Sequence, residues 1–276
     1  MQRRDPGGRA SPASERFHLM ETLGSGGNGV VHRALDLSLG VEVALKFLAR
    51  PAGRDLYRFK REFRALAEVT HPNLVRLYEL FVDGSEWSFS MELVGGLPLR
   101  DHLRRAPETL ARTFLQLADG VRAIHALGKI HRDLKPTNVL VDERGRVVIL
   151  DFGLVRGADP EHVDHTHEQA AVGTPAFMSP EQARDQPLTA ATDWYAVGVM
   201  LYEALTNRRP FEGTAAEVMR KRVLEDPPRP RALAPSVSPA LDELCMALLE
   251  RDPAKRADGS AIFAALGGAP SEATLA

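Results

Sequence analysis

Residues 23–31 form the glycine-rich stretch LGSGGNGVV, whose glycines follow the spacing G-x-G-x-x-G. Glycines at this spacing let backbone N–H groups approach phosphate oxygens, either in a strand–loop–helix turn that binds dinucleotides or in a hairpin between two strands. The residues that follow, VVHRALD, alternate in polarity and include β-branched side chains, which favours a second strand over a helix. The strand–loop–strand order therefore argues against the dinucleotide turn and favours a hairpin that covers phosphates.

The composition is that of an ordinary globular protein, with 44% hydrophobic and 26% charged residues among 276. The formal net charge of −2 provides no basic excess, so no nucleic-acid partner is predicted. Cys245 is the only cysteine, so an intrachain disulfide is excluded. It lies among leucines at helical spacing, which favours a buried position on a helix. No apolar run is long enough for a membrane span and the N-terminus lacks the apolar core of a secretory signal, so a cytoplasmic location is predicted.

The part of the chain before Gly95 is predicted to be rich in strands. Strands are expected over 18–24, 29–36, 41–48, 73–81 and 87–93, and a helix over 55–69 with Asp55 as its N-cap. The third strand is expected to alternate between two faces, one formed by Val41, Val43 and Leu45 and the other by Glu42, Ala44 and Lys46.

From Gly95 onward the pattern is mainly helical. Helices are expected over 109–128, 192–206, 215–225, 239–250 and 258–266, and a hairpin over 138–150 that turns at 143–145. The first of these helices would bury one face made of Leu110, Phe114, Leu117, Val121 and Ile124.

These elements predict an α+β fold class, with a small antiparallel β-sheet lobe that holds one helix and a larger, mainly helical lobe. The predicted limits are a disordered segment at 1–15, a domain at 16–266 and a flexible tail at 267–276. Within the domain, the lobes are expected at 16–93 and 97–266, with a hinge at 92–96.

Four further motifs follow the glycine loop in order. They are VALK, which places Lys46 on the third strand, HRDLKPTN at 131–138, DFG at 151–153, and GTPAFMSPE, which ends at Glu181. With these motifs the chain from Phe17 to Leu266 resembles the eukaryotic-type (Hanks-type) protein kinase family, most closely its bacterial serine/threonine members. The resemblance implies the two-lobed kinase fold, ATP with Mg²⁺ as cofactors, and protein substrates.

The family pattern implies how the nucleotide is held. Lys46 would offer its ammonium group to the α- and β-phosphates, oriented by Glu62 on the following helix, with Glu68 as the alternative partner. The remaining implied nucleotide contacts are the loop residues Leu23, Gly24, Ser25, Gly26, Gly27, Asn28 and Gly29, the apolar residues Val31, Ala44 and Leu140 around the base, and Met91, Glu92 and Leu93 at the hinge.

The same pattern implies the groups that act at the transferred phosphoryl group. Asp133 would accept or orient the proton of the substrate hydroxyl, and Lys135 would contact the γ-phosphate. Asn138 and Asp151 would give oxygen ligands to Mg²⁺, which Mn²⁺ could replace.

Several structural positions of the family are also matched. Leu66, Leu77, His131 and Phe152 would stack as a spine through the core. Asp193 would anchor the catalytic loop, and Glu181 and Arg256 would form a buried ion pair.

One threonine in the loop from Asp151 to Gly173 suggests a switch. Phosphorylated Thr166 would pair with Arg132 and order the loop, as in family members that carry this arginine, while the alternative is a solvated threonine. The nearby histidines His162, His165 and His167 favour a polar loop over a metal or pH sensor.

The predicted activity is that of a serine/threonine protein kinase that also phosphorylates itself. Lys135 within LKP and Thr174 within GTP favour serine and threonine over tyrosine, by resemblance. The alternatives are a pseudokinase scaffold and a small-molecule phosphotransferase. The sequence leaves the oligomeric state open, including kinase–kinase contacts for activation. The polar loop tip at Asn28 predicts weaker nucleotide binding than an Asn28→Phe variant would show.

Overall fold

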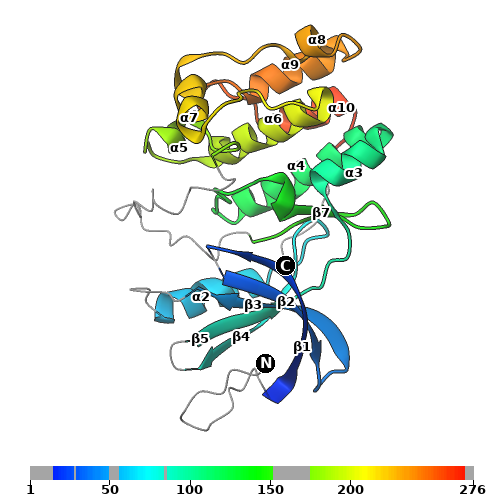
Figure 1. Ribbon diagram of the computed structural model, residues 1–276, viewed down its shortest axis with the longest axis vertical. Helices are drawn as coiled ribbons and strands as arrows, with labels where there is room; N and C mark the ends of the chain where they lie inside the picture. Colours follow the sequence, from blue (N-terminus) through cyan, green and yellow to red (C-terminus); the bar gives the residue numbers. More distant parts are fainter. Residues whose placement is uncertain (1–14, 28, 50–55, 84–85, 152–174, 271–276) are drawn as a thin grey trace. The chain divides into compact units, whose positions relative to one another are not determined.

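The computed structural model describes residues 15–27, 29–49, 56–83, 86–151 and 175–270, and these belong to two compact units. The first unit is built from Met1–Thr70 and Val75–Val94, and the second from His71–Leu74 and Gly95–Leu275. Figure 1 labels most of their helices and strands. The predicted fold class is confirmed, since a small antiparallel sheet with one helix and a mainly helical part are both present.

The first unit consists of a five-stranded antiparallel sheet and one helix. Its strands are hydrogen-bonded in the order β1-β2-β3-β5-β4, so β3 lies in the centre. The elements are β1 (Phe17–Gly26), β2 (Gly29–Asp36), β3 (Val41–Leu48), α2 (Leu56–Ala67), β4 (Leu77–Asp83) and β5 (Glu86–Met91).

Strand β3 alternates between two faces as predicted, but residues on both faces are buried. Val43 and Leu45 pack with Phe17 and Ala34 in a core on one face. Ala44 and Lys46 are buried on the other face, which α2 covers, whereas Val41 is exposed at the strand's start.

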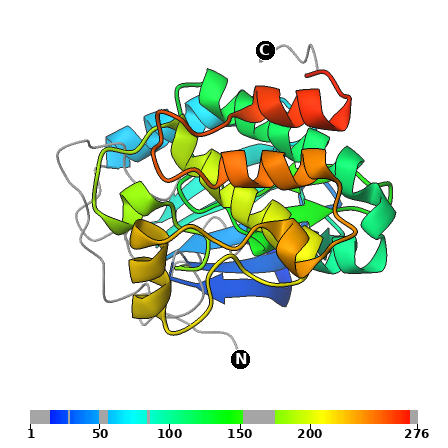
Figure 2. The same cartoon turned by 90° about the horizontal axis from the view of Figure 1, so that it is seen from above.

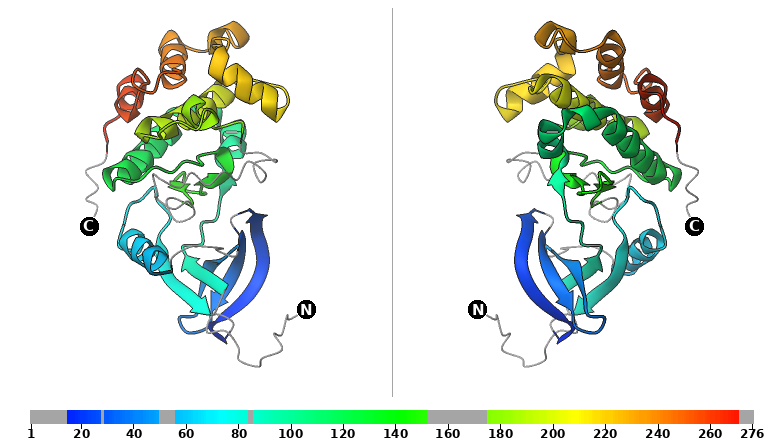
Figure 3. Two further views of the ribbon diagram at one scale, coloured as in Figure 1. Left: turned by 90° about the vertical axis from the view of Figure 1, so that its left-hand side faces the viewer. Right: turned by 90° about the vertical axis from the view of Figure 1, so that its right-hand side faces the viewer.

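Helix α2 confirms the predicted helix and lies beside β4, as Figure 3 shows from two sides. Its residues Phe59 and Phe63 place their rings 5.1 Å from Trp87 and 5.6 Å from Phe89 of β5. Aromatic pairs at such distances add to the apolar area that they bury. The proposed cap Asp55 lies outside the described residues.

The second unit contains a small three-stranded sheet and several packed helices. Its elements are β6 (Leu97–Pro98), α3 (Leu99–Arg105), a 3₁₀ turn η1 (Pro107–Thr109), α4 (Leu110–Ala126), a 3₁₀ turn η2 (Pro136–Asn138), β7 (Val139–Val141), β8 (Val147–Ile149), α5 (Pro180–Ala183), α6 (Ala190–Thr206), α7 (Ala215–Leu224), α8 (Pro230–Leu233), α9 (Pro239–Leu248) and α10 (Gly259–Leu266).

Helices α4 and α6 form the centre of this unit. On α4 the predicted inner face is buried at Phe114, Leu117, Val121 and Ile124, all at 1% exposure or less, whereas Leu110 at the helix start is only half-buried. Helix α6 is apolar around most of its circumference and is covered accordingly, with α9 packed on it and α10 packed on α4 (Figure 2). A Cβ at Gly198 of α6 would lie only 2.8 Å from the Cβ of Leu248, so a glycine permits the close contact with α9.

Residues 71–74 belong to the second unit, which corrects the predicted strand over 73–81. The Asn73 side-chain amide donates to the carbonyl of Val147 at 2.8 Å. The backbone carbonyl of Asn73 accepts from the N–H of Ile149 at 2.9 Å. These bonds hold Asn73 against β8, so the strand β4 begins only at Leu77. The short elements β6, α3, α5 and α8 were not predicted, because few residues in each display a period.

Candidate active site

Lys46 lies on the face of the first unit's sheet that α2 covers. Its side chain is 2% exposed, and in the strand register it stands opposite Val31 on β2 and Phe89 on β5. Directly opposed residues of antiparallel strands share a face, as do residues two apart on one strand. Because Ala44 is opposite Met91, the sheet gathers Val31, Ala44, Lys46 and Met91 on one face.

Of the two glutamates predicted as partners of Lys46, Glu62 is the more buried. Glu62 is half-buried and precedes Phe63, whose ring contacts Phe89, the residue opposite Lys46. Glu68 is exposed and follows the end of the helix. The burial pattern therefore favours Glu62 over Glu68 as the predicted partner of Lys46.

The glycine loop joins β1 to β2 as a hairpin in which Gly26 is paired with Gly29. Gly29 has φ of 128°, and a Cβ there would lie 1.9 Å from the carbonyl oxygen of Phe47, so the sheet itself requires this glycine. A Cβ at Gly24 or Gly26 would meet nothing within 4 Å in the described part of the chain. The lack of side chains there leaves the backbone accessible to a ligand. The other described loop residues, Leu23, Ser25 and Gly27, are exposed, and Asn28 lies outside the described residues.

Strand β5 ends at Met91, which is buried, and the half-buried residues Glu92 and Leu93 follow. The Glu92 N–H donates to the carbonyl of Arg76 at 2.8 Å. A bond from the Glu92 backbone to a nucleotide would therefore use the carbonyl group. Leu66 and Leu77, two of the predicted spine residues, are buried in the same unit.

In the second unit, Asp193 of α6 holds the backbone of the HRD segment. One carboxylate oxygen accepts from the N–H of His131 at 2.8 Å, and the other accepts from the N–H of Arg132 at 2.9 Å. His125 Nε2 lies 2.8 Å from the first oxygen. At 1% exposure Asp193 is buried and fully engaged, which fits the predicted anchor role.

The His131 ring fixes the next stretch of backbone. Its Nδ1 accepts from the N–H of Asp133 at 3.3 Å, which leaves Nε2 to carry the proton that it donates to the carbonyl of Leu150 at 2.8 Å. His131 is buried at 5% exposure, as expected of a spine residue. The fourth spine residue, Phe152, lies outside the described residues.

Asp133 has a cation and an amide as close neighbours. Lys135 Nζ donates to Asp133 Oδ2 at 2.8 Å, and the Asn138 side chain donates to the Asp133 carbonyl at 2.8 Å. Both carboxylate and ammonium are partly exposed, at 18% and 25%. The pair is thus preformed and still accessible to a substrate group.

The hairpin β7–β8 brings the predicted metal ligands together. Val139 pairs with Ile149, and the Leu150 N–H donates to the carbonyl of Asn138 at 2.8 Å, so Asn138 and Asp151 lie at the same open end. Because the Asn138 amide nitrogen faces Asp133, its amide oxygen is turned away from that bond. Asp151 follows with φ of 57° and a half-buried side chain. An amide and a carboxylate oxygen fit a hard cation such as Mg²⁺.

The predicted ion pair between Glu181 and Arg256 is present and fully buried. Arg256 donates to both Glu181 oxygens, at 2.7 and 2.9 Å, and Thr192 donates to one of them at 3.0 Å. Burial acts to raise the pKa of Glu181, but the hydrogen bonds and charge of Arg256 outweigh it and the pKa is lowered. This pair fixes α5, the helix that carries Glu181.

Some predicted residues cannot be placed against this geometry. Asn28, Phe152, Thr166, Thr174 and the histidines at 162, 165 and 167 lie outside the described residues. Leu140 is described and is half-buried on β7, opposite Val148.

Sequence reasoning missed Arg222 of α7. This arginine is 1% exposed, and its two terminal nitrogens donate to the carbonyls of Pro175 and Ala176, at 2.5 and 2.7 Å. Burial lowers its pKa. It therefore holds the GTPAF segment where the described chain resumes, a role that nothing local in the sequence indicates.

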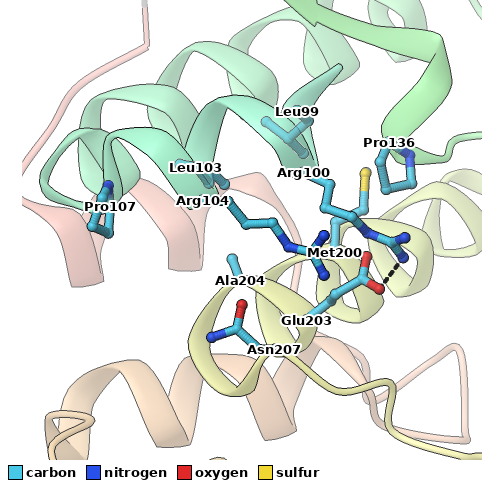
Figure 4. A pocket seen from close by; sticks show the side chains of 10 residues that line it. All are labelled: Leu99, Arg100, Leu103, Arg104, Pro107, Pro136, Met200, Glu203, Ala204 and Asn207. Atoms are coloured by element: carbon cyan, nitrogen blue, oxygen red, sulfur yellow. Dashed lines mark hydrogen bonds and ion pairs between the residues drawn. The ribbon is translucent and has the colours of Figure 1, made fainter. Parts of the chain in front are cut away.

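A separate hollow of about 190 Å³ lies between α3, α6 and Pro136 of η2 (Figure 4). Arg100 of α3 pairs with Glu203 of α6 across it. A second arginine, Arg209, lies 3.7 Å from the same carboxylate. The sequence reasoning did not single out these residues.

Comparison with known proteins identifies the family. The family model described as the protein kinase domain matches residues 17–265. The chain belongs to the eukaryotic-type protein kinase family. This confirms the family predicted from the glycine loop and the four motifs, and it implies the use of ATP.

The kinase domain is similar to several bacterial proteins. It is 38% identical over 79% of its length to the serine/threonine-protein kinase PkaA of Streptomyces coelicolor, and covers 44% of that protein. It is 37% identical over 94% of its length to the serine/threonine-protein kinase PknL of Mycobacterium bovis, covering 67% of it. For PknB of Mycobacterium tuberculosis the identity is 36% over 89% of this chain, which spans 41% of that kinase.

The chain thus spans less than half the length of PkaA and PknB. In the described ranges, no helix of the kinase domain has both the length and the apolar character needed to cross a membrane.

Proposed function

We propose that this kinase domain transfers the γ-phosphoryl group of ATP to serine and threonine hydroxyls of proteins, with Mg²⁺ as the metal. The observation that carries the proposal is the paired Asp133 and Lys135, in a loop whose backbone Asp193 and His131 hold. Phosphoryl transfer depends mainly on positioning and charge neutralisation, and a preformed acid–base pair on a fixed loop supports both.

The chemistry follows from the residues of this loop. The Asp133 carboxylate accepts the proton of the substrate hydroxyl, whose oxygen then attacks the γ-phosphorus atom. Lys135, whose Nζ lies 2.8 Å from the carboxylate, offers a positive charge next to it. Bound MgATP would supply the phosphoryl group, and Asn138 and Asp151 would hold the metal through oxygen atoms.

The nucleotide itself is assigned to residues of the first unit. Val31, Ala44 and Met91 offer apolar surface on the same face as Lys46, whose ammonium suits phosphate oxygens. The open space around Gly24 and Gly26 supports backbone contact with phosphates, because neither position needs a glycine for packing.

Protein hydroxyls are the proposed acceptors. The names of PkaA, PknL and PknB as serine/threonine-protein kinases support this class, as does Lys135 in the LKP motif. We extend the proposal to autophosphorylation at Thr166. The buried Nε of Arg132, which has no hydrogen-bond partner among the described residues, supports a role for this arginine in binding a phosphate. A cytoplasmic location is proposed because ATP is a cytoplasmic metabolite.

Transfer of labelled phosphate from ATP to a generic protein substrate tests the function. We expect Asp133→Asn and Lys46→Met to lower kcat by about 10²-fold or more, because each removes a charge that acts in the transfer. Lys255→Met, at a lysine that is 75% exposed, is the control and should leave kcat unchanged.

The same assay separates the alternatives. Nucleotide binding without transfer by the unmodified chain would favour a pseudokinase scaffold. Transfer to small molecules but to no protein would favour a small-molecule phosphotransferase. Transfer that survives Asp133→Asn would contradict the mechanism.

A further inference from the structure

Gln182 of α5 is bound to the backbone of the catalytic loop. Its side-chain Nε2 donates to the carbonyl of Arg132 at 2.8 Å. Arg132 immediately precedes Asp133, the proposed base. The motif GTPAFMSPE ends one residue before Gln182, which is why sequence reasoning passed over it.

The direction of the Gln182 amide is fixed by the cap of its own helix. Its Oε1 accepts from the N–H of Ser179 at 2.9 Å, and the Ser179 hydroxyl accepts from the N–H of Gln182 at 3.3 Å. This reciprocal capping box holds the amide by its oxygen, so the NH₂ group is turned outward from the helix. The helix is itself fixed by the buried pair of Glu181 and Arg256.

The bonded carbonyl belongs to a strained residue. Arg132 has φ of 67°, a left-handed conformation that is unfavourable for a residue with a Cβ. Such a conformation persists only where its surroundings hold it. Asp193 holds the N–H of Arg132 and Gln182 holds its carbonyl, so the peptide groups on both sides are bonded.

We propose that Gln182 is a positioning residue for catalysis, which aims the Asp133 carboxylate by holding the Arg132 carbonyl. The groups concerned lie together, since Arg132, Asp133, Asp193 and Gln182 line one small cavity. The peptide group that Gln182 holds is the one that leads into Asp133. Loss of this bond should let the peptide rotate and should misalign the base without altering the residues assigned to ATP. This inference rests on the proposed kinase activity.

Two substitutions remove the bond in different ways. Gln182→Glu keeps an oxygen for the Ser179 N–H but has no hydrogen to donate to the Arg132 carbonyl. Gln182→Met keeps the approximate shape and removes both polar atoms. A matched control is Glu217→Met on α7, because Glu217 occupies the same N3 position in a second capping box with Thr214, where it is exposed.

Steady-state kinetics provide the first measurement. We expect both Gln182 variants to lower kcat by about tenfold, equivalent to about 1.4 kcal/mol, with the KM for ATP unchanged within about twofold. Glu217→Met should leave both constants at their original values. Because partial unfolding lowers the apparent kcat and leaves KM unchanged, kcat is expressed per folded molecule, counted by titration with ATP.

Amide hydrogen exchange of the peptide that spans 129–138 provides a measurement that needs no activity. Faster exchange there in both Gln182 variants, but not in Glu217→Met, supports the proposal even if the unmodified chain transfers no phosphate and the proposed function fails. Exchange that stays at the original rate in Gln182→Glu, or kcat that stays unchanged while the unmodified chain is active, would overturn it.

Discussion

At the scale of single residues, the glycine loop contains glycines of two kinds. Gly29 is required by the sheet, since φ is 128° and a Cβ would collide with the Phe47 carbonyl. Gly26, its partner in the hairpin, has open space around its Cα. One motif therefore combines a glycine needed for folding with glycines that the fold does not need.

This difference gives a paired prediction. Gly29→Ala should lower the free energy of unfolding by about 2–4 kcal/mol, through strain and collision. Gly26→Ala should leave it within about 1 kcal/mol, because nothing is displaced. If the loop covers phosphates, Gly26→Ala should weaken ATP binding instead.

Urea unfolding and ATP titration of both variants check this pair. Equal destabilisation by the two substitutions would contradict the packing argument. Unchanged ATP affinity in Gly26→Ala would contradict the assignment of this loop to the nucleotide.

At the scale of elements, helix α5 depends on one ion pair. Only four residues form it, which is too short for a helix that is stable alone. The fully buried pair of Arg256 and Glu181 fastens it to the segment before α10. Arg256→Met should cost about 3–5 kcal/mol because it leaves an unpaired buried carboxylate, and adding Glu181→Gln should recover part of that loss.

The same pair makes stability depend on pH. The pKa of Glu181 in the folded chain lies below its ordinary value of 4.5. As the pH falls, the unfolded chain therefore binds this proton first, so the stabilisation is complete above about pH 4.5 and is lost below it. The difference in unfolding free energy between the original chain and Glu181→Gln should stay constant from pH 7 to about pH 5 and shrink as the pH falls below about 4.5.

Fluorescence during urea unfolding can follow this helix and its unit. The chain has two tryptophans, and both are buried, Trp87 in the first unit and Trp194 in the second. A Trp87→Phe background isolates the signal of the second unit, where Glu181 lies. A pH-independent difference between the variants would show that the pair does not act as described.

At the scale of the whole molecule, long periodic elements were predictable and contacts between them were not. The periods of α4, α6, α9 and of β2 and β3 predicted those elements closely. The burial of both faces of β3 was not predictable, because it depends on distant elements such as α2, whose Phe63 packs on Phe89 opposite Lys46. Whether a strand is buried on one face or on both is decided by elements that are distant in sequence.

The candidate site shows the same limit. The motif residues Lys46, Asp133 and Asn138 could be predicted because their order along the chain is distinctive. Gln182 and Arg222 could not, because each acts on a backbone carbonyl some 50 residues away, at Arg132 and in the segment 175–176. Every residue has a backbone carbonyl, so the sequence does not indicate which carbonyl a distant side chain will bind.

The buried Cys245 of α9 allows the opening rate of the second unit to be measured by thiol labelling. Its side chain has 0% exposure and packs under α6, and burial raises the pKa of its thiol, so the reactive thiolate is scarce. As it is the only thiol, a thiol reagent should modify the native protein at the rate at which the second unit opens, and one equivalent at once in urea. Rapid labelling without urea would contradict this burial. New cysteines placed on the surface could then carry probes without removal of the native one.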